Sequence, residues 1–196
     1  KILALDSSGL VASVAVVEND TLLAEYTVNY KKTHSQTLLP MLDEISNMTE
    51  LDLSTIDAIA VAGGPGSFTG LRIGSATAKG LGLALEKPLI SIPTTAAIAY
   101  NIWDTDKFVC PIMDARRNQV YTGVYCYTDH RLDTVWEQDT MSIEALAEGL
   151  NCLDHEVIFL GDGVAFTGKI EALLTYSVFL APAHVNRQRA AAVGAL

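Results

Sequence analysis

Cysteine is scarce in this chain of 196 residues, and the spacing of the few cysteines excludes several kinds of site. Cys110, Cys126 and Cys152 are odd in number and form no CxxC pair. This argues against a disulfide framework and against a zinc site made of cysteines. It fits a protein that works in a reducing compartment.

Long apolar runs and targeting segments are also missing. No run of about 18 apolar residues occurs, so we expect no transmembrane helix. The opening, KILALDSS, lacks the basic and then apolar pattern of a signal peptide. We therefore expect a cytoplasmic location. The first Met is absent and the ending, AAAVGAL, looks like the interior of a helix, so we expect a chain trimmed at both ends.

Basic residues are few: 13 Lys and Arg stand against 23 Asp and Glu, which gives a net charge of -10 and a pI near 4.7. Proteins that grip nucleic-acid phosphates do so with Lys and Arg. We therefore expect no strong direct binding to nucleic acid, although acidity also simply keeps many proteins in solution. Apolar residues make up 49% of the chain, enough for a sizeable core and for apolar surface that a partner could cover.

The motifs of common catalytic and metal sites are missing too. The histidines form no HExxH motif and no pair four residues apart, so we predict no metal site. Ser67 lacks the GxSxG context of a serine hydrolase, so we predict no covalent catalysis. The sequence thus predicts no catalytic, cofactor-binding or metal-binding residue. The four histidines are His34, His130, His155 and His184.

The first half of the chain reads as an α/β unit. Apolar runs and turn residues predict a meander of three strands, followed by helices that alternate with two more strands. The predicted strands are 2–6, 11–17, 21–28, 57–62 and 88–92. The predicted helices are about 34–47, 70–85 and, capped by Thr94 or Thr95, a third that runs to Ile102.

The first predicted helix has an apolar stripe and a capping pattern. Thr33 with Gln36 three residues later fits a capping box. Pro40 should kink the helix or mark its first turn. The stripe consists of His34, Leu38, Met41, Leu42 and Ile45.

The second predicted helix follows a glycine-rich loop, GGPGSFTG, at residues 63–70. A loop between a strand and a helix can bind phosphate, but this one lacks the Lys of a Walker motif, and a tight turn explains it equally. In the helix, small residues recur every four positions, although an interior Gly costs about 1 kcal/mol relative to Ala. Close packing inside one domain and a contact between subunits both explain this small-residue spine, Gly70, Gly74, Ala78 and Gly82.

The second half restarts near residue 107 and repeats the order of elements. Strands are predicted at 107–114, 119–127, 131–139, 156–160 and 177–180, and helices at 142–150, capped by Ser142, and 164–174. Both halves open with a strand that ends in Asp, then a turn and a strand: LDSSGLVASVAV and MDARRNQVYTGVY. This indicates an internal duplication, with domains at 1–104 and 105–196.

Two aspartates stand where a nucleotide could be held. Asp6 and Asp114 each end a first strand, where a carboxylate could bind a metal–nucleotide complex or could cap its own turn. The Gly161–Gly163 turn could receive an adenine ring or could be an ordinary turn between a strand and a helix. An ATPase or kinase that uses Asp6 and the glycine-rich turns is therefore the alternative function.

Three stretches together resemble the TsaB/YeaZ family: GGPGSFTGLRIGSATAKGLGLAL, THSQTLLPMLDEI and MDARRNQVYTGVY. The resemblance spans roughly residues 1–175. It implies the duplicated ASKHA (actin-like ATPase, ribonuclease H-like) fold, with two mixed-sheet halves flanked by helices. It also implies a cytoplasmic role in making threonylcarbamoyladenosine in tRNA, beside a catalytic TsaD-like subunit and a TsaE-like ATPase.

The resemblance further implies a scaffold role. TsaD carries an HxxxH metal pair just after the strand that matches PLISI, and the corresponding positions here are near Thr94 and Ile98, neither of which replaces an imidazole. The older label of the wider family, a glycoprotein endopeptidase, fails on the same ground.

In TsaB-like proteins the first two helices pair with TsaD or with a second TsaB. We therefore expect a TsaD partner or a homodimer through 34–47 and 70–85, with an interface made of His34, Leu38, Leu42, Ile45, Gly70, Gly74, Ala78 and Gly82. A self-associating regulator at a promoter is a further possibility, which the negative charge disfavours.

Overall fold

The computed structural model describes residues 1–30 and 34–196, and they form two compact units. Unit 1 comprises Lys1–Ala97 together with Gln188–Leu196, and unit 2 comprises Ile98–Arg187. The sequence suggested a boundary at 104/105 and a C-terminal segment that stays with the second half. The last nine residues instead return to unit 1, because their helix packs on its sheet.

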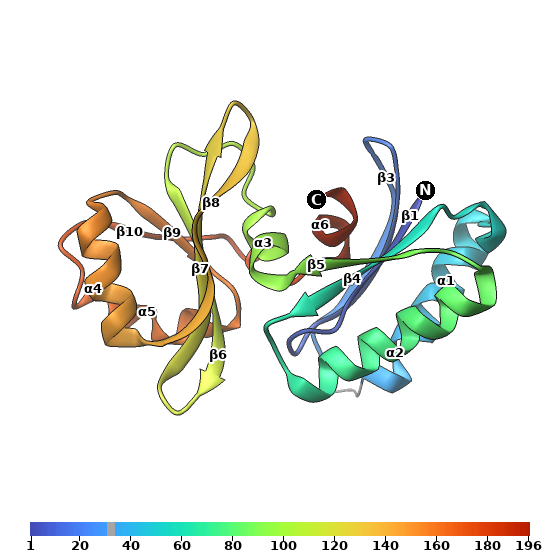
Figure 1. The fold of residues 1–196 in the computed structure, drawn as a ribbon, viewed down its shortest axis with the longest axis horizontal. Coiled ribbons are helices and arrows are strands. Elements are labelled where there is room, and N and C mark those ends of the chain that lie inside the picture. The colour runs from blue at the N-terminus through green and yellow to red at the C-terminus, as the bar shows by residue number, and fades with distance from the viewer. Residues whose placement is uncertain (31–33) are drawn as a thin grey trace. The chain divides into compact units, whose positions relative to one another are not determined.

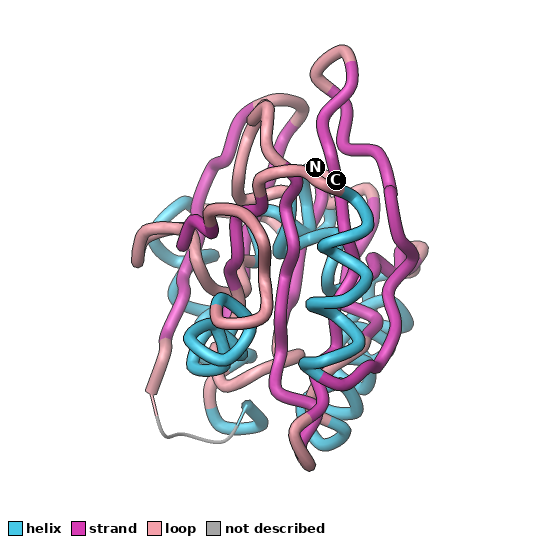
Figure 2. The backbone as a smooth tube through the Cα atoms, turned by 90° about the vertical axis from the view of Figure 1, so that its left-hand side faces the viewer, coloured by secondary structure: helices cyan, strands magenta, loops and turns pink. Residues whose placement is uncertain are grey.

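Unit 1 is built on one mixed sheet with the order β3-β2-β1-β4-β5. The β1, β2 and β3 strands form an antiparallel meander, while β4 and β5 run parallel to β1. Figure 2 distinguishes these strands from the helices. The strands are β1 (Ile2–Asp6), β2 (Ala12–Glu18), β3 (Thr21–Val28), β4 (Ala58–Gly64) and β5 (Leu89–Pro93). The helices are η1 (His34–Gln36), α1 (Leu38–Thr49), η2 (Leu53–Thr55), α2 (Phe68–Leu85), α3 (Thr94–Ala99) and α6 (Ala190–Ala195).

Unit 2 repeats this topology. Its sheet has the order β10-β9-β6-β7-β8, in which β6–β8 form the meander and β9 and β10 run parallel to β6. The predicted duplication is therefore confirmed (Figure 1). The strands are β6 (Phe108–Arg116), β7 (Gln119–Thr128), β8 (Arg131–Ser142), β9 (Val157–Leu160) and β10 (Val178–Leu180). The helices are α4 (Ile143–Leu153), η3 (Asp162–Phe166) and α5 (Thr167–Glu171).

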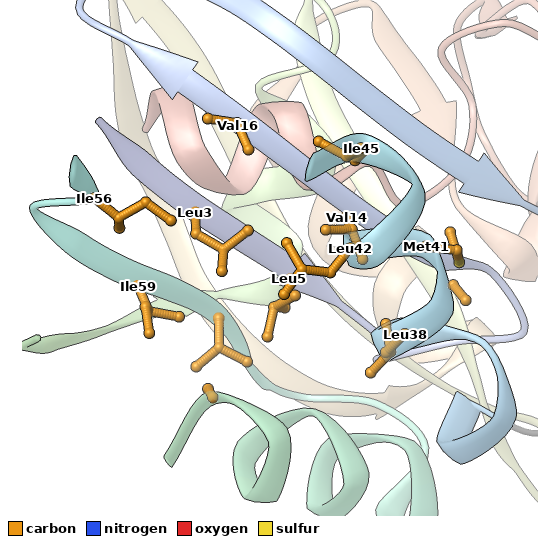
Figure 3. Close-up of a cluster of buried hydrophobic side chains, with 13 residues drawn as sticks. Leu3, Leu5, Val14, Val16, Leu38, Met41, Leu42, Ile45, Ile56 and Ile59 are labelled. Carbon is orange, nitrogen blue, oxygen red and sulfur yellow. The ribbon is translucent and has the colours of Figure 1, made fainter. Parts of the chain in front are cut away.

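The two faces of the unit 1 sheet are packed differently. Large side chains on one face meet α1 and α2, as the close-up in Figure 3 shows for Leu5, Val14 and Leu42. The other face carries alanines, among them Ala4 and Ala15, against which α6 packs. Since small side chains let a helix backbone approach closely, this face accepts the short, alanine-rich C-terminal helix.

Several predicted boundaries need correction. Pro40 is the third residue of α1, in its first turn, where a missing N–H costs no helical hydrogen bond. The predicted cap Thr33 lies outside the described residues. The predicted helix 164–174 is split into η3 and α5, and α3 ends at Ala99 rather than at Ile102. Ser142 is confirmed as the cap of α4, because its hydroxyl accepts from the Ala145 N–H at 3.1 Å.

Within residues 1–30 and 34–196, no helix combines the length and the apolar character that crossing a membrane requires.

Candidate functional site: the surface of α1 and α2 and the turn at Asp6

The small-residue spine of α2 faces the protein's own sheet. Gly70, Gly74, Ala78 and Gly82 are all buried. A Cβ built on Gly74 would come within 2.4 Å of the Ser7 hydroxyl, and one on Gly82 within 2.8 Å of the Leu89 side chain. These four residues, predicted as part of a partner interface, are therefore covered by the sheet of unit 1 on the side that they face. Their small size serves packing inside unit 1.

The stripe of α1 is buried in the same way. Leu38, Leu42 and Ile45 are 1%, 4% and 5% exposed, and they pack on the sheet and on Ala78. These three residues, which the sequence predicted as interface residues, thus belong to the core of unit 1. His34, the fourth predicted member on this side, is half-buried, and its Nε2 lies 2.9 Å from the Gly9 carbonyl oxygen.

Both helices also carry exposed apolar side chains, which on α2 lie on the side opposite to the buried spine. On α2, Phe68 is 73% and Leu83 is 84% exposed. On α1, Leu39 is 53% and Met48 is 77% exposed. A Cβ built on Gly80 would meet nothing within 4 Å. We call this set, Leu39, Met48, Phe68, Gly80 and Leu83, the outer helical surface.

Helical periodicity in the sequence shows the residues of the outer side of α2, but it does not show whether that side or the spine is exposed. Phe68, Arg72, Ala76, Lys79 and Leu83 recur at a spacing of three or four residues, as the spine does. The Arg72 guanidinium lies over the Phe68 ring, 5.0 Å from its centroid. Since both sides of α2 carry small and apolar residues, spacing alone does not decide which side faces the sheet.

The Asp6 carboxyl group caps its own turn. Oδ1 accepts hydrogen bonds from the Ser8 N–H at 2.8 Å and from the Ser8 hydroxyl at 2.7 Å. The side chain is fully buried, and Oδ2 has no partner among the described residues. Burial raises the pKa of Asp6 to about 6, against the opposing effects of the Ser8 hydrogen bonds and the nearby His34. Of its two sequence interpretations, the geometry matches the capping one.

The glycine-rich loop closes over this turn. The Ser67 N–H donates to the Ser8 carbonyl oxygen at 2.7 Å, and a Cβ built on Gly66 would come within 2.3 Å of that oxygen. The Ser67 hydroxyl in turn accepts from the Gly70 N–H at 3.3 Å. These donors at the start of α2 are therefore used by the chain itself. A tight turn explains the loop without a phosphate.

In unit 2 the carboxylates of Asp114 and Asp162 also accept hydrogen bonds from backbone N–H groups. Asp162 Oδ1 accepts from the Asp114 N–H at 3.1 Å, and Asp114 Oδ1 accepts from the Arg116 N–H at 2.7 Å. Burial raises the pKa of Asp162, opposed by its hydrogen bond with the Asp114 backbone and by Arg187. A Cβ on Gly161 would come within 2.3 Å of the Ile112 carbonyl oxygen. Local packing thus explains the Gly161–Gly163 turn.

The positions that correspond to a metal pair have structural roles. Thr94 is buried, and its hydroxyl accepts from the Gly64 N–H at 3.1 Å. Ile98 is fully buried. Within the described part of the chain, no group of three or more His, Cys, Asp and Glu could hold a metal ion. Cys110 is buried, and desolvation raises its thiol pKa to about 12.

Comparison with known proteins identifies relatives along most of the chain. Residues 21–194 match the family model described as TsaD, tRNA N6-adenosine threonylcarbamoyltransferase. The chain is 37% identical over 160 residues to the tRNA threonylcarbamoyladenosine biosynthesis protein TsaB of Bacillus subtilis, a match that covers 82% of this chain and 70% of that protein. It is 32% identical to the TsaB of Escherichia coli, with 83% and 71% covered.

Solved structures agree on the fold. YeaZ from Pseudomonas aeruginosa superposes with a TM-score of 0.81 at 26% identity, over 95% of this chain and 86% of that one. At 14% identity, the inorganic polyphosphate/ATP-glucomannokinase of an Arthrobacter strain matches with a TM-score of 0.54, over 99% and 96% of the two chains. This second likeness concerns the fold alone. The duplicated ASKHA fold expected from the sequence is confirmed.

Proposed function

The chain belongs to the TsaB family of tRNA threonylcarbamoyladenosine biosynthesis proteins, and we propose from this premise that it is a non-catalytic scaffold subunit. It binds and supports a TsaD-like catalytic subunit that transfers threonylcarbamoyl to adenosine in tRNA. A TsaE-like ATPase acts in the same assembly. The site of action is the cytoplasm, where tRNA is modified.

The main support for a non-catalytic role is that the candidate carboxylates are engaged in hydrogen bonds with the chain's own backbone. Asp6 is fully buried and caps its turn, and Asp114 and Asp162 are tied into the backbone of unit 2. A group that acts on a substrate must reach it within hydrogen-bond distance. At the positions where a metal pair is expected in a catalytic relative, Thr94 and Ile98 supply no imidazole. These facts favour a non-catalytic scaffold subunit over an enzyme.

The outer helical surface supports the partner assignment. Phe68 and Leu83 are large apolar side chains that are mostly exposed on one helix, and Leu39 and Met48 lie exposed on the helix beside it. Interfaces draw their affinity from a few such side chains that become buried on association. We therefore assign the partner surface to the outer helical surface, whereas the sequence suggested the residues that are buried against the sheet. A second copy of the chain is the alternative occupant.

The charge of the chain supports a division of labour with the partner. At a net charge of -10, electrostatic attraction to tRNA phosphates is unfavourable over the chain as a whole. In this proposal the TsaD-like subunit holds the tRNA, and the present chain holds that subunit.

The decisive test is a reconstitution in which one component is left out. Threonylcarbamoyl transfer to tRNA is measured with the TsaD-like and TsaE-like proteins and the enzyme that forms the carbamoyl-adenylate, with and without this chain. The chain alone is the control. We expect transfer that requires the chain and never arises from it alone. Full activity without the chain would refute the scaffold role, and ATP turnover by the isolated chain that Asp6→Ala abolishes would restore the ATPase alternative.

A further inference from the structure

Unit 2 holds an exposed tryptophan between two tyrosines. The Trp103 ring meets the Tyr100 ring at a centroid distance of 5.9 Å and an interplanar angle of 84°. It meets the Tyr127 ring at 5.6 Å and 63°. Both geometries are edge-to-face contacts, which stabilise aromatic pairs. We call Tyr100, Trp103 and Tyr127 the aromatic platform.

The segment that carries Trp103 is also held by a polar contact between two side chains. Asp104 Oδ2 lies 2.6 Å from Nδ1 of His130, which stands at the turn between β7 and β8. The segment with Trp103 and Asp104 is thus joined to the segment with Tyr127 and His130 by an aromatic contact and by a polar contact. A side chain that is already fixed loses little conformational entropy when a partner covers it.

Trp103 nevertheless remains 59% exposed. Tryptophan is rarely left so open in a protein that can bury it, and it is enriched among the residues that dominate binding energy at interfaces. The two tyrosines cover only part of Trp103, and the remaining exposed part is what a partner can cover.

The charge around the platform selects the kind of partner. The segments 100–107 and 127–133 contain four aspartates against two cationic residues, Lys107 and Arg131, and Lys107 Nζ lies 3.8 Å from Asp106 Oδ1. Asp106 is 90% exposed. Burial, together with Tyr100 and Asp104, raises the pKa of Tyr127, so its hydroxyl stays neutral and the negative charge belongs to the aspartates. The four aspartates are Asp104, Asp106, Asp129 and Asp133.

We infer that the aromatic platform and its aspartates form a docking site for an arginine-bearing segment of a protein partner. A guanidinium stacks on an indole face by a cation–π contact and pairs with a carboxylate at the same time. Nucleic acid could also stack on Trp103, but the aspartates would repel its phosphates. This site lies within unit 2 and does not require the pairing proposed for α1 and α2.

The test uses the whole chain and a defined probe. The hexapeptide Gly-Ser-Arg-Arg-Ser-Gly is titrated, to about 5 mM because a single contact of this kind is weak, while the indole N–H resonances are followed by NMR. The chain has only two tryptophans, so the loss of one signal in Trp103→Ala assigns it. A peptide with citrulline in place of arginine has the same shape without the charge.

We expect the arginine peptide to shift the Trp103 resonance and the citrulline peptide to shift it about tenfold less at equal concentration. Asp106→Asn should weaken the arginine response, whereas the matched variant Asp139→Asn, an exposed aspartate elsewhere on β8, should not. An equal response to both peptides, or no response, would overturn the inference. A stronger response to a uridine hexanucleotide than to the arginine peptide would overturn it in favour of RNA.

Discussion

The carbonyl oxygen of Ser7 lies so close to Gly70 that a Cβ built on this glycine would come within 2.0 Å of it. The Ser7 hydroxyl also donates a hydrogen bond to the Gly70 carbonyl oxygen at 2.9 Å. The turn after the first strand and the start of α2 are thereby held together by a close backbone approach and a hydrogen bond from a side chain to the backbone. This contact fixes which side of α2 faces inward, and so which side is open to a partner.

Gly70→Ala should therefore lower the free energy of unfolding by about 3 kcal/mol, because the backbone beneath it cannot yield as a side chain could. Gly80→Ala on the same helix is the matched control. Its Cβ would meet nothing within 4 Å, so removing the flexible Gly should raise stability by about 0.5–1 kcal/mol. Urea denaturation of both variants measures the difference. Equal effects would contradict the packing described here.

The packing of α2 on the sheet also determines which substitutions can test partner binding without disturbing the fold. A bulky residue at Gly74 would collide with the Ser7 hydroxyl and disturb the fold, so a loss of association would not be informative. Leu83 is the better probe, because it is 84% exposed.

Leu83→Asp should change the unfolding free energy by no more than about 0.5 kcal/mol and weaken binding to the TsaD-like subunit at least about tenfold. Isothermal titration calorimetry measures the affinity, and sedimentation measures self-association in the same variant. Leu173→Asp, at an exposed leucine of unit 2, is the control that should leave both unchanged. Normal affinity of Leu83→Asp would show that the partner binds elsewhere.

Asp6 predicts a particular dependence of stability on pH. Its folded pKa of about 6 lies above the model value of 3.8, so the folded state binds this proton more tightly than the unfolded chain does. The resulting stabilisation is complete below about pH 4 and is lost as the pH rises through about 6. The shift of about two units corresponds to about 3 kcal/mol.

The Asp6→Asn variant keeps an oxygen that accepts hydrogen bonds from Ser8 but has no carboxyl group to titrate. The variant should match the wild type near pH 4 and exceed it in unfolding free energy by about 3 kcal/mol near pH 8. Asp52 is the opposite control, because its hydrogen bond from the Ser54 N–H lowers its pKa and its contribution is lost as the pH falls. Urea titrations across this range test both, and a constant difference for Asp6→Asn would contradict the assigned shift.

Glu25 anchors the returning C-terminal segment. Its Oε1 accepts from the Ala191 N–H at 3.0 Å, and its Oε2 accepts from the Arg189 side chain. Glu25→Ala should lower stability by about 2 kcal/mol, since it leaves a partly buried guanidinium without its partner. Glu18→Ala removes an exposed carboxylate 3.6 Å from Lys1 and should cost less than about 1 kcal/mol. Thermal unfolding compares them, and equal losses would show that Glu25 does not hold α6.

The sequence predicted the strands of both units closely because their signals are local. Alternating or continuous apolar runs bounded by turns mark β1, β2 and β7 to within a residue or two. The repeated order of elements predicted the duplication for the same reason. The weaker predictions were the ends of helices: α3 is shorter than expected, and a 3₁₀ turn takes the first part of the helix expected after β9.

The sequence pattern does not show which side of α1 and α2 faces the sheet. The predicted interface residues His34, Leu38, Leu42 and Ile45 belong to an apolar stripe, and a stripe has the same pattern whether it faces a sheet or a partner. The same holds for the spine of α2, because glycine and alanine occur on both its buried and its exposed side. Tertiary contacts distinguish the two sides, such as that of Gly70 with Ser7 and that of Gly82 with Leu89.

The sequence by itself determined the duplicated α/β architecture and the family, since both depend on periodicity and on motifs that are contiguous in the chain. The tertiary structure alone decided that Asp6 is buried in its own turn, that α6 returns to the alanine face of the first sheet, and that Leu83 rather than Gly74 is exposed. These outcomes depend on contacts between residues far apart in the chain, such as Glu25 with Arg189, whose energies no local pattern contains.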